Sequence, residues 1–199
     1  MNIHKQKNVL DRRSGIGGSD ATKIVAGEWK QLYQLKKGLI DDEDLSFVLP
    51  VQMGIYTEDF NRDWFTAHTD LPVQEVDSTL KHKKHDFMLA NLDGFVLNEN
   101  LKPLGVFEAK HVHAFTKDDT ILEKYYAQIQ HYMIVSNLPQ AWLSVIFGNN
   151  KWKSFHVQAD KKFQKKLIQA EEMFWQHIIN DEEPADYVEF SSIGGTNDE

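Results

Sequence analysis

The sequence predicts an α/β fold, in the wide sense that includes α+β, with a mixed central β-sheet flanked by helices. Helical patterns come first along the chain, strand patterns follow, and a helix, two strands and a last helix complete it. Hydrophobic residues make up 41% and charged residues 26% of the 199 residues, as in ordinary globular proteins. No repeat or long low-complexity linker divides the chain. We therefore expect one domain over residues 1–190 and a loose tail at 191–199.

The first part of the chain is predicted to be helical. A polar arm at residues 1–13 leads to a glycine-rich turn at 15–18, after which Ser19 or Asp20 can cap a short helix. Gly27 closes that helix. Hydrophobic spacing predicts two further helices, over residues 29–37 and 51–68.

Strands and helices are then predicted to alternate. Apolar and β-branched runs bounded by turn residues predict strands at 87–97, 104–111, 141–147 and 151–157. The turn at residues 148–150 would join the last two strands as a hairpin. Apolar residues at helical spacing predict helices at 121–135 and 159–182, the second of them amphipathic along its length.

The composition limits the chemistry that the chain can perform. It contains no cysteine, which excludes disulfides, thiol catalysis, iron–sulfur clusters and thiolate zinc sites. A metal ion must therefore bind to oxygen or imidazole. With 30 acidic and 22 basic residues the net charge is −8, so DNA binding would require the basic residues to gather on one surface. No apolar run approaches the roughly 18 residues of a membrane span, and we expect a cytoplasmic protein without a membrane partner.

Two predicted neighbouring strands carry candidate catalytic residues. Side chains alternate along a strand, so Glu108 and Lys110 project from the same face of a strand that is otherwise apolar. Such buried charges are costly unless they are paired or bound to a metal ion. Asp93, on the preceding strand, can lie beside Glu108, and Mg²⁺ would relieve the repulsion between the two carboxylates. The alternative is a structural ion pair without a catalytic role.

Glu58 is a third acid of interest. It falls on the same predicted helical stripe as Val51, Ile55 and Phe65, so we expect it to point inward. It could pair with Arg62, one turn further on, or share a metal ion with the two strand carboxylates. Periodicity alone leaves both partners open.

Two other motifs suit contacts with a phosphate group or with an active site. The glycine-rich turn presents free amides at a helix N-terminus, and Arg12 or Arg13 can add a charged donor. Tyr125, Gln128 and Tyr132 share one face of their predicted helix, where the glutamine can orient a neighbouring group. Simple capped helices and amphipathic edges are the commoner origin of both patterns.

In combination these motifs resemble the YqaJ viral recombinase family, which belongs with the phage lambda-type alkaline exonucleases of the PD-(D/E)XK nuclease superfamily. The resemblance rests on segments at residues 12–21, 54–58, 92–94, 108–110 and 125–133. Each is weak alone, but their order and spacing are specific. Leu92 stands where the superfamily name has proline.

The resemblance implies a restriction-endonuclease-like core and a Mg²⁺-dependent 5′→3′ exonuclease. Such an enzyme degrades one strand of linear double-stranded DNA from its ends and leaves 3′ single-stranded DNA for recombination by strand annealing. Asp93, Glu108 and the carbonyl of Ala109 would ligate Mg²⁺, and Glu58 would help to bind a second ion, with Mn²⁺ as a substitute. Lys110 would orient the attacking water and help to deprotonate it.

The resemblance also implies partners and supporting residues. Arg12 and Ser19 match positions that hold the 5′-phosphate of the DNA end, while Tyr125 and Gln128 match the helix that supports the site. Relatives form ring-shaped homotrimers around DNA and act beside a single-strand annealing protein, in the cytoplasm of a bacterium or of a phage-infected host. Two alternatives remain open: a restriction-like endonuclease of the same superfamily, and a non-catalytic module that binds DNA ends.

Overall fold

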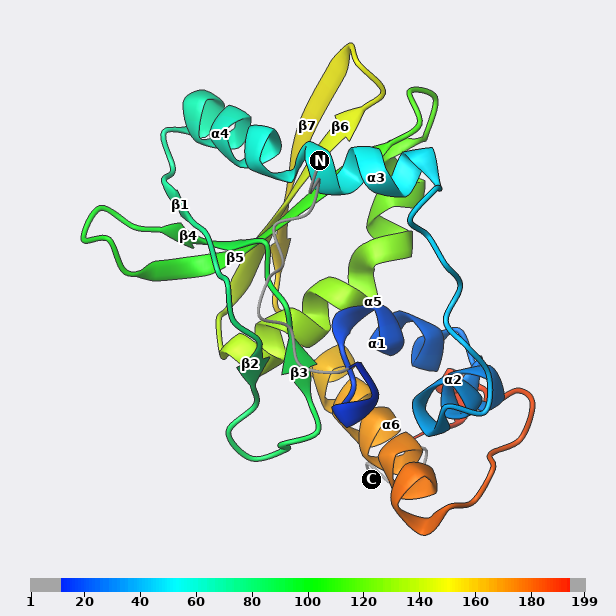
Figure 1. The fold of residues 1–199 in the computed structure, drawn as a ribbon. Coiled ribbons are helices and arrows are strands. Elements are labelled where there is room, and N and C mark those ends of the chain that lie inside the picture. The colour runs from blue at the N-terminus through cyan, green and yellow to red at the C-terminus, as the bar shows by residue number, and fades with distance from the viewer. Residues whose placement is uncertain (1–11, 194–199) are drawn as a thin grey trace.

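The computed structural model describes residues 12–193 (Figure 1). The elements are η1 (Arg12–Ser14), α1 (Gly18–Val25), α2 (Trp29–Lys37), α3 (Leu49–Tyr56), α4 (Glu58–Thr69), β1 (Val73–Gln74), β2 (Leu80–Lys81), β3 (Leu89–Ala90), β4 (Gly94–Leu97), β5 (Pro103–Val112), α5 (Asp118–Ser136), β6 (Gln140–Phe147), β7 (Lys151–Gln158), α6 (Lys161–Asn180) and η2 (Phe190–Ser192). The predicted arm (residues 1–13) lies almost entirely outside the described residues. Most of the predicted tail (residues 191–199) lies outside them as well.

A five-stranded mixed sheet forms the centre of the fold, as the sequence predicts. Its strand order is β1-β4-β5-β6-β7, and β2 and β3 form a separate two-stranded sheet. β5 and β6 are parallel, whereas β4–β5 and β6–β7 are antiparallel. A parallel pair needs a long crossover connection, and α5 supplies it.

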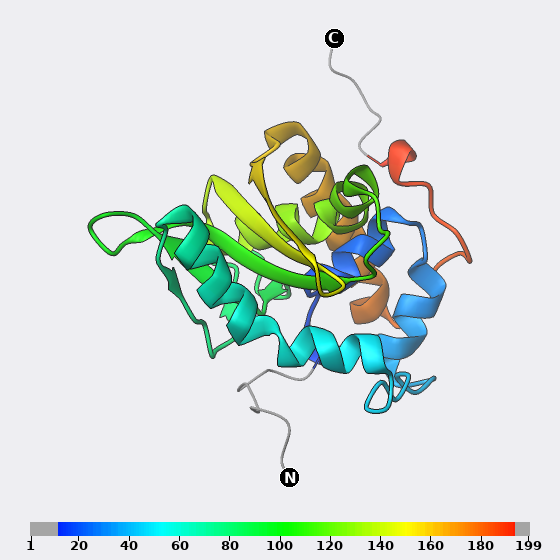
Figure 2. The same ribbon diagram turned by 90° about the horizontal axis from the view of Figure 1, so that it is seen from above.

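Helices cover both faces of the sheet. Figure 2 shows α3 and α4 along one side and α5 and α6 on the other. Phe107 of β5 packs with Phe65 of α4 and with Val96. Its neighbour Val106 faces the larger core that α5 closes with Ile129. Because strand residues alternate between faces, Glu108 lies on the same side of β5 as Val106 and therefore faces α5.

The predicted helix at residues 51–68 is wrong in one respect, because it is two helices. The chain turns at Thr57, whose hydroxyl donates to the Met53 carbonyl at 2.7 Å and competes with the helical ladder. Phe65 is fully buried, but every residue of α3 is at least partly exposed. The predicted stripe through Val51 and Ile55 therefore does not continue into the core.

The predicted strand at residues 87–97 is also divided. β3 pairs with β2 in the small sheet, whereas β4 pairs with β1 and β5 in the large one. The chain leaves one sheet and enters the other over residues 91–93. The segments before and after residues 91–93 are both apolar and similar in composition. Hydrophobic periodicity therefore does not reveal that the chain passes from one sheet to the other there.

Local signals account for the other helix ends. α1 begins at Gly18, before the predicted cap at Ser19 or Asp20, because Asp20 accepts a hydrogen bond from the Gly17 amide at 2.8 Å and closes the first turn. Gly38 ends α2 in the left-handed conformation, at φ 67°. Asp160 caps α6 by accepting from the Phe163 amide at 3.0 Å. Within residues 12–193, no helix combines the length and the apolar character that a membrane crossing demands.

Candidate active site

Asp93 lies at the point where β4 stops pairing with β5. The last paired residues are Gly94 and Phe107, so no strand within residues 12–193 pairs with the next part of β5 on this side. The carboxylate of Asp93 lies there instead, and its Oδ2 accepts a hydrogen bond from the Ala109 amide at 2.9 Å. The N–H and C=O of one strand residue point to the same side, so the Ala109 carbonyl faces this side as well.

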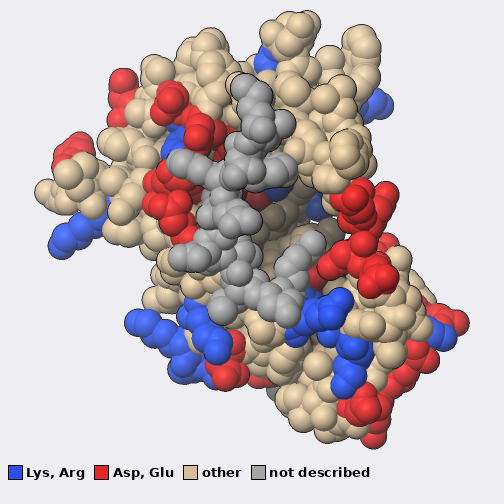
Figure 3. Space-filling view, in the orientation of Figure 1, with Lys and Arg blue, Asp and Glu red and all other residues tan. Residues whose placement is uncertain are grey.

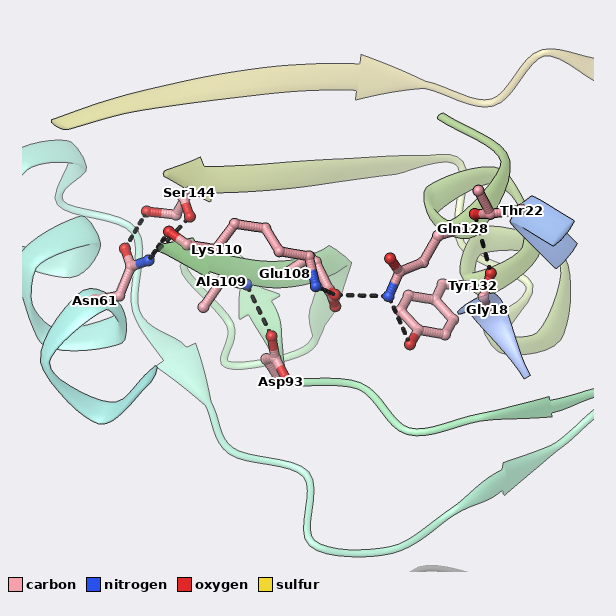
Figure 4. A network of polar contacts seen from close by, with 10 residues as sticks. All are labelled: Gly18, Thr22, Asn61, Asp93, Glu108, Ala109, Lys110, Gln128, Tyr132 and Ser144. Atoms are coloured by element: carbon pink, nitrogen blue, oxygen red, sulfur yellow. Dashed lines mark hydrogen bonds and ion pairs between the residues drawn. The ribbon is translucent and has the colours of Figure 1, made fainter. Parts of the chain in front are cut away.

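Glu108 and Lys110 project together from β5 towards α5, as predicted (Figure 4). The Lys110 Nζ lies 2.5 Å from Glu108 Oε1 and 5.0 Å from the centre of the Tyr125 ring. Glu108 is only 2% exposed, whereas the Lys110 side chain is 22% exposed. The second oxygen of Glu108, Oε2, is buried and has no hydrogen-bond partner among residues 12–193.

The environment of Glu108 opposes its ionisation. Burial, together with the negative charge of Asp93, raises the pKa of Glu108 to about 8 in spite of the contact with Lys110. Burial lowers the pKa of Lys110, but the attraction of Glu108 and Asp93 outweighs it, so the pKa of Lys110 is raised. The lysine is therefore an ammonium group at neutral pH.

α5 supplies the groups that hold Glu108 in place. The amide of Gln128 donates from Nε2 to Glu108 Oε1 at 2.8 Å, and its nitrogen lies 3.0 Å from the Tyr132 hydroxyl (Figure 4). The predicted shared face of Tyr125, Gln128 and Tyr132 is thus present and directed at the strand carboxylates. Gly18 of α1 packs against Tyr132 so closely that a Cβ there would lie 2.6 Å from its ring.

Glu58 occupies the first position of α4, where its carboxylate lies 3.2 Å from Arg62 Nη2. The same charge helps to raise the pKa of Glu108, after the larger contributions of burial and of Asp93. The ordinary helix pair with Arg62 therefore exists, and Glu58 also acts electrostatically on the strand carboxylates. Its part in binding a metal ion stays a prediction.

The donor set fits a hard divalent cation. Asp93, Glu108 with its unbonded oxygen and the Ala109 carbonyl are the oxygen ligands that Mg²⁺ accepts, and Mg²⁺ commonly takes one or two carboxylates and keeps several waters. Within residues 12–193 no three His, Asp or Glu side chains are grouped to hold a metal ion.

The residues predicted to hold a phosphate are only partly placed. Ser19 is exposed in the first turn of α1, and the side chain of Arg12 lies outside the described part of the chain. The alternative, Arg13, lies close to Gly38 at the end of α2. On the face shown in Figure 3, acidic side chains flank the middle, and basic and acidic side chains both occur in the lower part.

Sequence reasoning missed three polar residues around the site. Lys36 is buried and binds Asp20 and the Gly15 carbonyl, each at 2.6 Å, so it ties the glycine-rich turn to α2. Asn61 and Ser144 are buried beside Lys110. The signal for Lys36 and Asn61 was their place on apolar stripes, at helical spacing from Trp29 and Phe65 respectively.

Known proteins share both the sequence pattern and the fold. Residues 9–139 match the YqaJ-like viral recombinase domain. The chain is 28% identical over 188 residues to a Bacillus subtilis (strain 168) protein, YqaJ, and the match covers 89% of this chain and 57% of that protein. It therefore spans little more than half of the length of this relative.

Two solved exonuclease structures share the architecture. The alkaline exonuclease LHK-Exo of Laribacter hongkongensis, in complex with dAMP, superposes with a TM-score of 0.69 at 17% identity, over 86% of this chain and 91% of that one. A phage-related exonuclease of Haemophilus somnus 129PT has a TM-score of 0.64 at 13% identity, over 84% and 96% of the two chains. The chain thus has the same fold as these exonucleases, with the mixed, helix-flanked sheet that the sequence predicts. Because its matched region covers most of the described chain, this protein belongs to the YqaJ-like viral recombinase family.

Proposed function

We propose that this chain is a Mg²⁺-dependent 5′→3′ exonuclease that degrades one strand of linear double-stranded DNA from its ends and leaves 3′ single strands. The observation that carries the proposal is the cluster of Asp93, Glu108 and Lys110, in which a buried Glu108 oxygen has no protein partner among the described residues. An ion pair of purely structural use would not require a second carboxylate at Asp93. The family and the shared exonuclease fold support a nuclease.

In this proposal Asp93, Glu108 and the Ala109 carbonyl would hold one Mg²⁺, and Glu58 would help to hold a second. When bound, the ions would supply an activated water and charge stabilisation at phosphorus. The Lys110 ammonium would donate hydrogen bonds to the water and to the scissile phosphate from Nζ. Gln128 would keep Glu108 Oε1 occupied, so that Oε2 remains directed at the cation.

Contacts with the DNA end and with other proteins are further parts of the proposal. Ser19 and Arg12 would bind the terminal 5′-phosphate, supported by the exposure of Ser19 in the first turn of α1. The chain would assemble as a homotrimeric ring and act beside a single-strand annealing protein. Light scattering on the purified chain would give the mass of the assembly, and a mass of one subunit would contradict the ring.

Digestion of 5′-phosphorylated linear duplex DNA, beside a closed circular duplex, tests the activity. We expect the linear DNA alone to be degraded to single strands and mononucleotides with Mg²⁺, and to remain intact with EDTA. Cutting of the circle would instead support the restriction-like endonuclease. No cleavage of either DNA, combined with tight binding to ends, would support the non-catalytic module.

A further inference from the structure

We propose that Asn61 is a positioning residue that fixes the first turn of α4 against β5 and so sets the places of Glu58 and Lys110. This inference rests on the proposed function, because it concerns the same site. Asn61 follows Glu58 by three residues and is only 1% exposed. An amide buried this deeply is stable only when its donors and its acceptor have partners.

The amide of Asn61 connects α4 to the strands that carry the site (Figure 4). Its Nδ2 donates to the Ser144 carbonyl at 2.9 Å and to the Lys110 carbonyl at 3.3 Å. Its Oδ1 accepts from the Ser144 hydroxyl at 2.6 Å, and this hydroxyl accepts in turn from Trp152 Nε1 at 2.8 Å. The network therefore joins α4, β5, β6 and β7 through one buried side chain.

A second contact holds the same turn of α4. The Thr57 hydroxyl lies 3.2 Å from Nδ1 of His111, which follows Lys110 on β5. Glu58 thus lies between two polar contacts that both lead to the strand carrying Glu108. Apolar packing of Phe65 on Phe107 holds α4 against the sheet. Because hydrophobic contact has no preferred direction, it does not fix the position of α4 along β5. The polar contacts are what define how far along β5 the helix sits.

Gln130 offers a matched control. Its side chain is also fully buried, and it donates to the Gln158 carbonyl at 2.9 Å and accepts from the Asp160 amide and from Gln164, each at 3.0 Å. These contacts join α5 to β7 and α6 instead of reaching the site. Asn61→Leu and Gln130→Leu therefore remove similar buried amides, but only the first removes a contact with Lys110.

The first measurement is hydrogen exchange by mass spectrometry on the protein without metal or DNA. We expect Asn61→Leu to speed exchange at residues 57–62 and 108–112, and Gln130→Leu to leave those segments unchanged. Ser144→Ala is a milder variant that keeps the Asn61 donors. It should speed exchange in the same two segments, but by a smaller factor than Asn61→Leu does. If neither Asn61→Leu nor Ser144→Ala changes exchange at residues 57–62 and 108–112 relative to Gln130→Leu, the inference is overturned.

The second measurement separates positioning from simple loss of stability. At a temperature where both variants are folded, Asn61→Leu should weaken Mn²⁺ binding, measured by calorimetry, and lower kcat by about 10- to 100-fold with KM for DNA nearly unchanged. Gln130→Leu should change neither quantity. Equal Mn²⁺ affinity and kcat in the two variants would overturn the positioning role. If the wild type does not cleave DNA, the proposed function fails. Hydrogen exchange and Mn²⁺ binding then still test whether Asn61 positions the site.

Discussion

At the scale of single residues, Glu108 combines burial, a neighbouring carboxylate and an unbonded oxygen. Replacing it by glutamine keeps the size of the side chain and removes the negative charge that would hold the cation. We expect Glu108→Gln to lower Mg²⁺-dependent DNA cleavage by at least about 100-fold, the scale at which removal of one electrostatic contact acts on a transition state. Glu99→Gln, at an exposed turn, is the matched control and should cleave normally. Full activity in the Glu108→Gln variant would show that Glu108 is not part of the active site.

The raised pKa of Glu108 predicts how metal binding depends on pH. Because burial and Asp93 raise this pKa to about 8, the carboxyl group must release a proton before it can ligate Mg²⁺ at neutral pH. Affinity should therefore rise with pH, by up to about tenfold per unit, and level off above pH 8. Calorimetric titration at pH 6.5, 7.5 and 8.5 measures this slope. A pH-independent affinity in the wild type would contradict the prediction.

At the scale of elements, the close packing of α1 on α5 supports the site from behind. A Cβ at Gly18 would lie 2.6 Å from the Tyr132 ring and 2.8 Å from Cγ of Gln128, the side chain that donates to Glu108. We expect Gly18→Ala to destabilise the fold by about 1–3 kcal/mol, as overpacking commonly does. It should also lower the rate of cleavage, because Gln128 must move. Urea unfolding and DNA digestion measure the two effects.

Gly54→Ala is the matched control for this prediction. Gly54 also lies in a helix, but a Cβ there would have nothing within 4 Å. The alanine should stabilise α3 by about 0.5–1 kcal/mol through its better helix propensity. If Gly18→Ala behaves like Gly54→Ala, the contact between α1 and α5 does not constrain the site.

The elements also show where sequence patterns are reliable. The predicted α2, α5, β5, β6 and β7 were confirmed, because each is a single run with one periodicity and clear end signals. The predicted helix at 51–68 and strand at 87–97 were each divided, because the breaks at Thr57 and at residues 91–93 come from side-chain and strand-pairing contacts. No periodicity records such contacts.

At the scale of the whole molecule, a buried pair joins α5, α6 and β3. His131 Nδ1 lies 2.8 Å from Glu171 Oε1, and His131 Nε2 lies 2.9 Å from the Leu89 carbonyl. Both ring nitrogens face acceptors, which is the arrangement of a protonated imidazole. Burial lowers the pKa of His131, but Glu171 outweighs it and raises that pKa; burial also raises the pKa of Glu171. Between the unfolded and the folded pKa values of His131, the imidazole is therefore protonated in the folded state and neutral in the unfolded state.

This pair predicts that the protein loses stability as the pH rises. The pKa of His131 is raised on folding, so its contribution is fully present below the unfolded value of about 6.5 and is lost as pH rises through the higher folded value. The free energy of unfolding should fall by up to about 1.4 kcal/mol per pH unit within that range. Urea unfolding from pH 6 to 9 measures the slope. His131→Gln should reduce it, whereas His113→Gln, at an exposed position, should not.

The sequence by itself determined the fold class, the positions of most helices and strands and the candidate residues Asp93, Glu108 and Lys110. These follow from short-range spacing: alternation puts Glu108 and Lys110 on one face, and helical period puts Tyr125, Gln128 and Tyr132 on another. The tertiary structure decided which partners meet. The end of β4 brings Asp93 to the Ala109 amide, α5 brings Gln128 to Glu108, and α4 brings Asn61 to the Lys110 carbonyl. Such contacts join distant parts of the chain, and their energies depend on packing and burial that exist only once the sheet and its helices have come together.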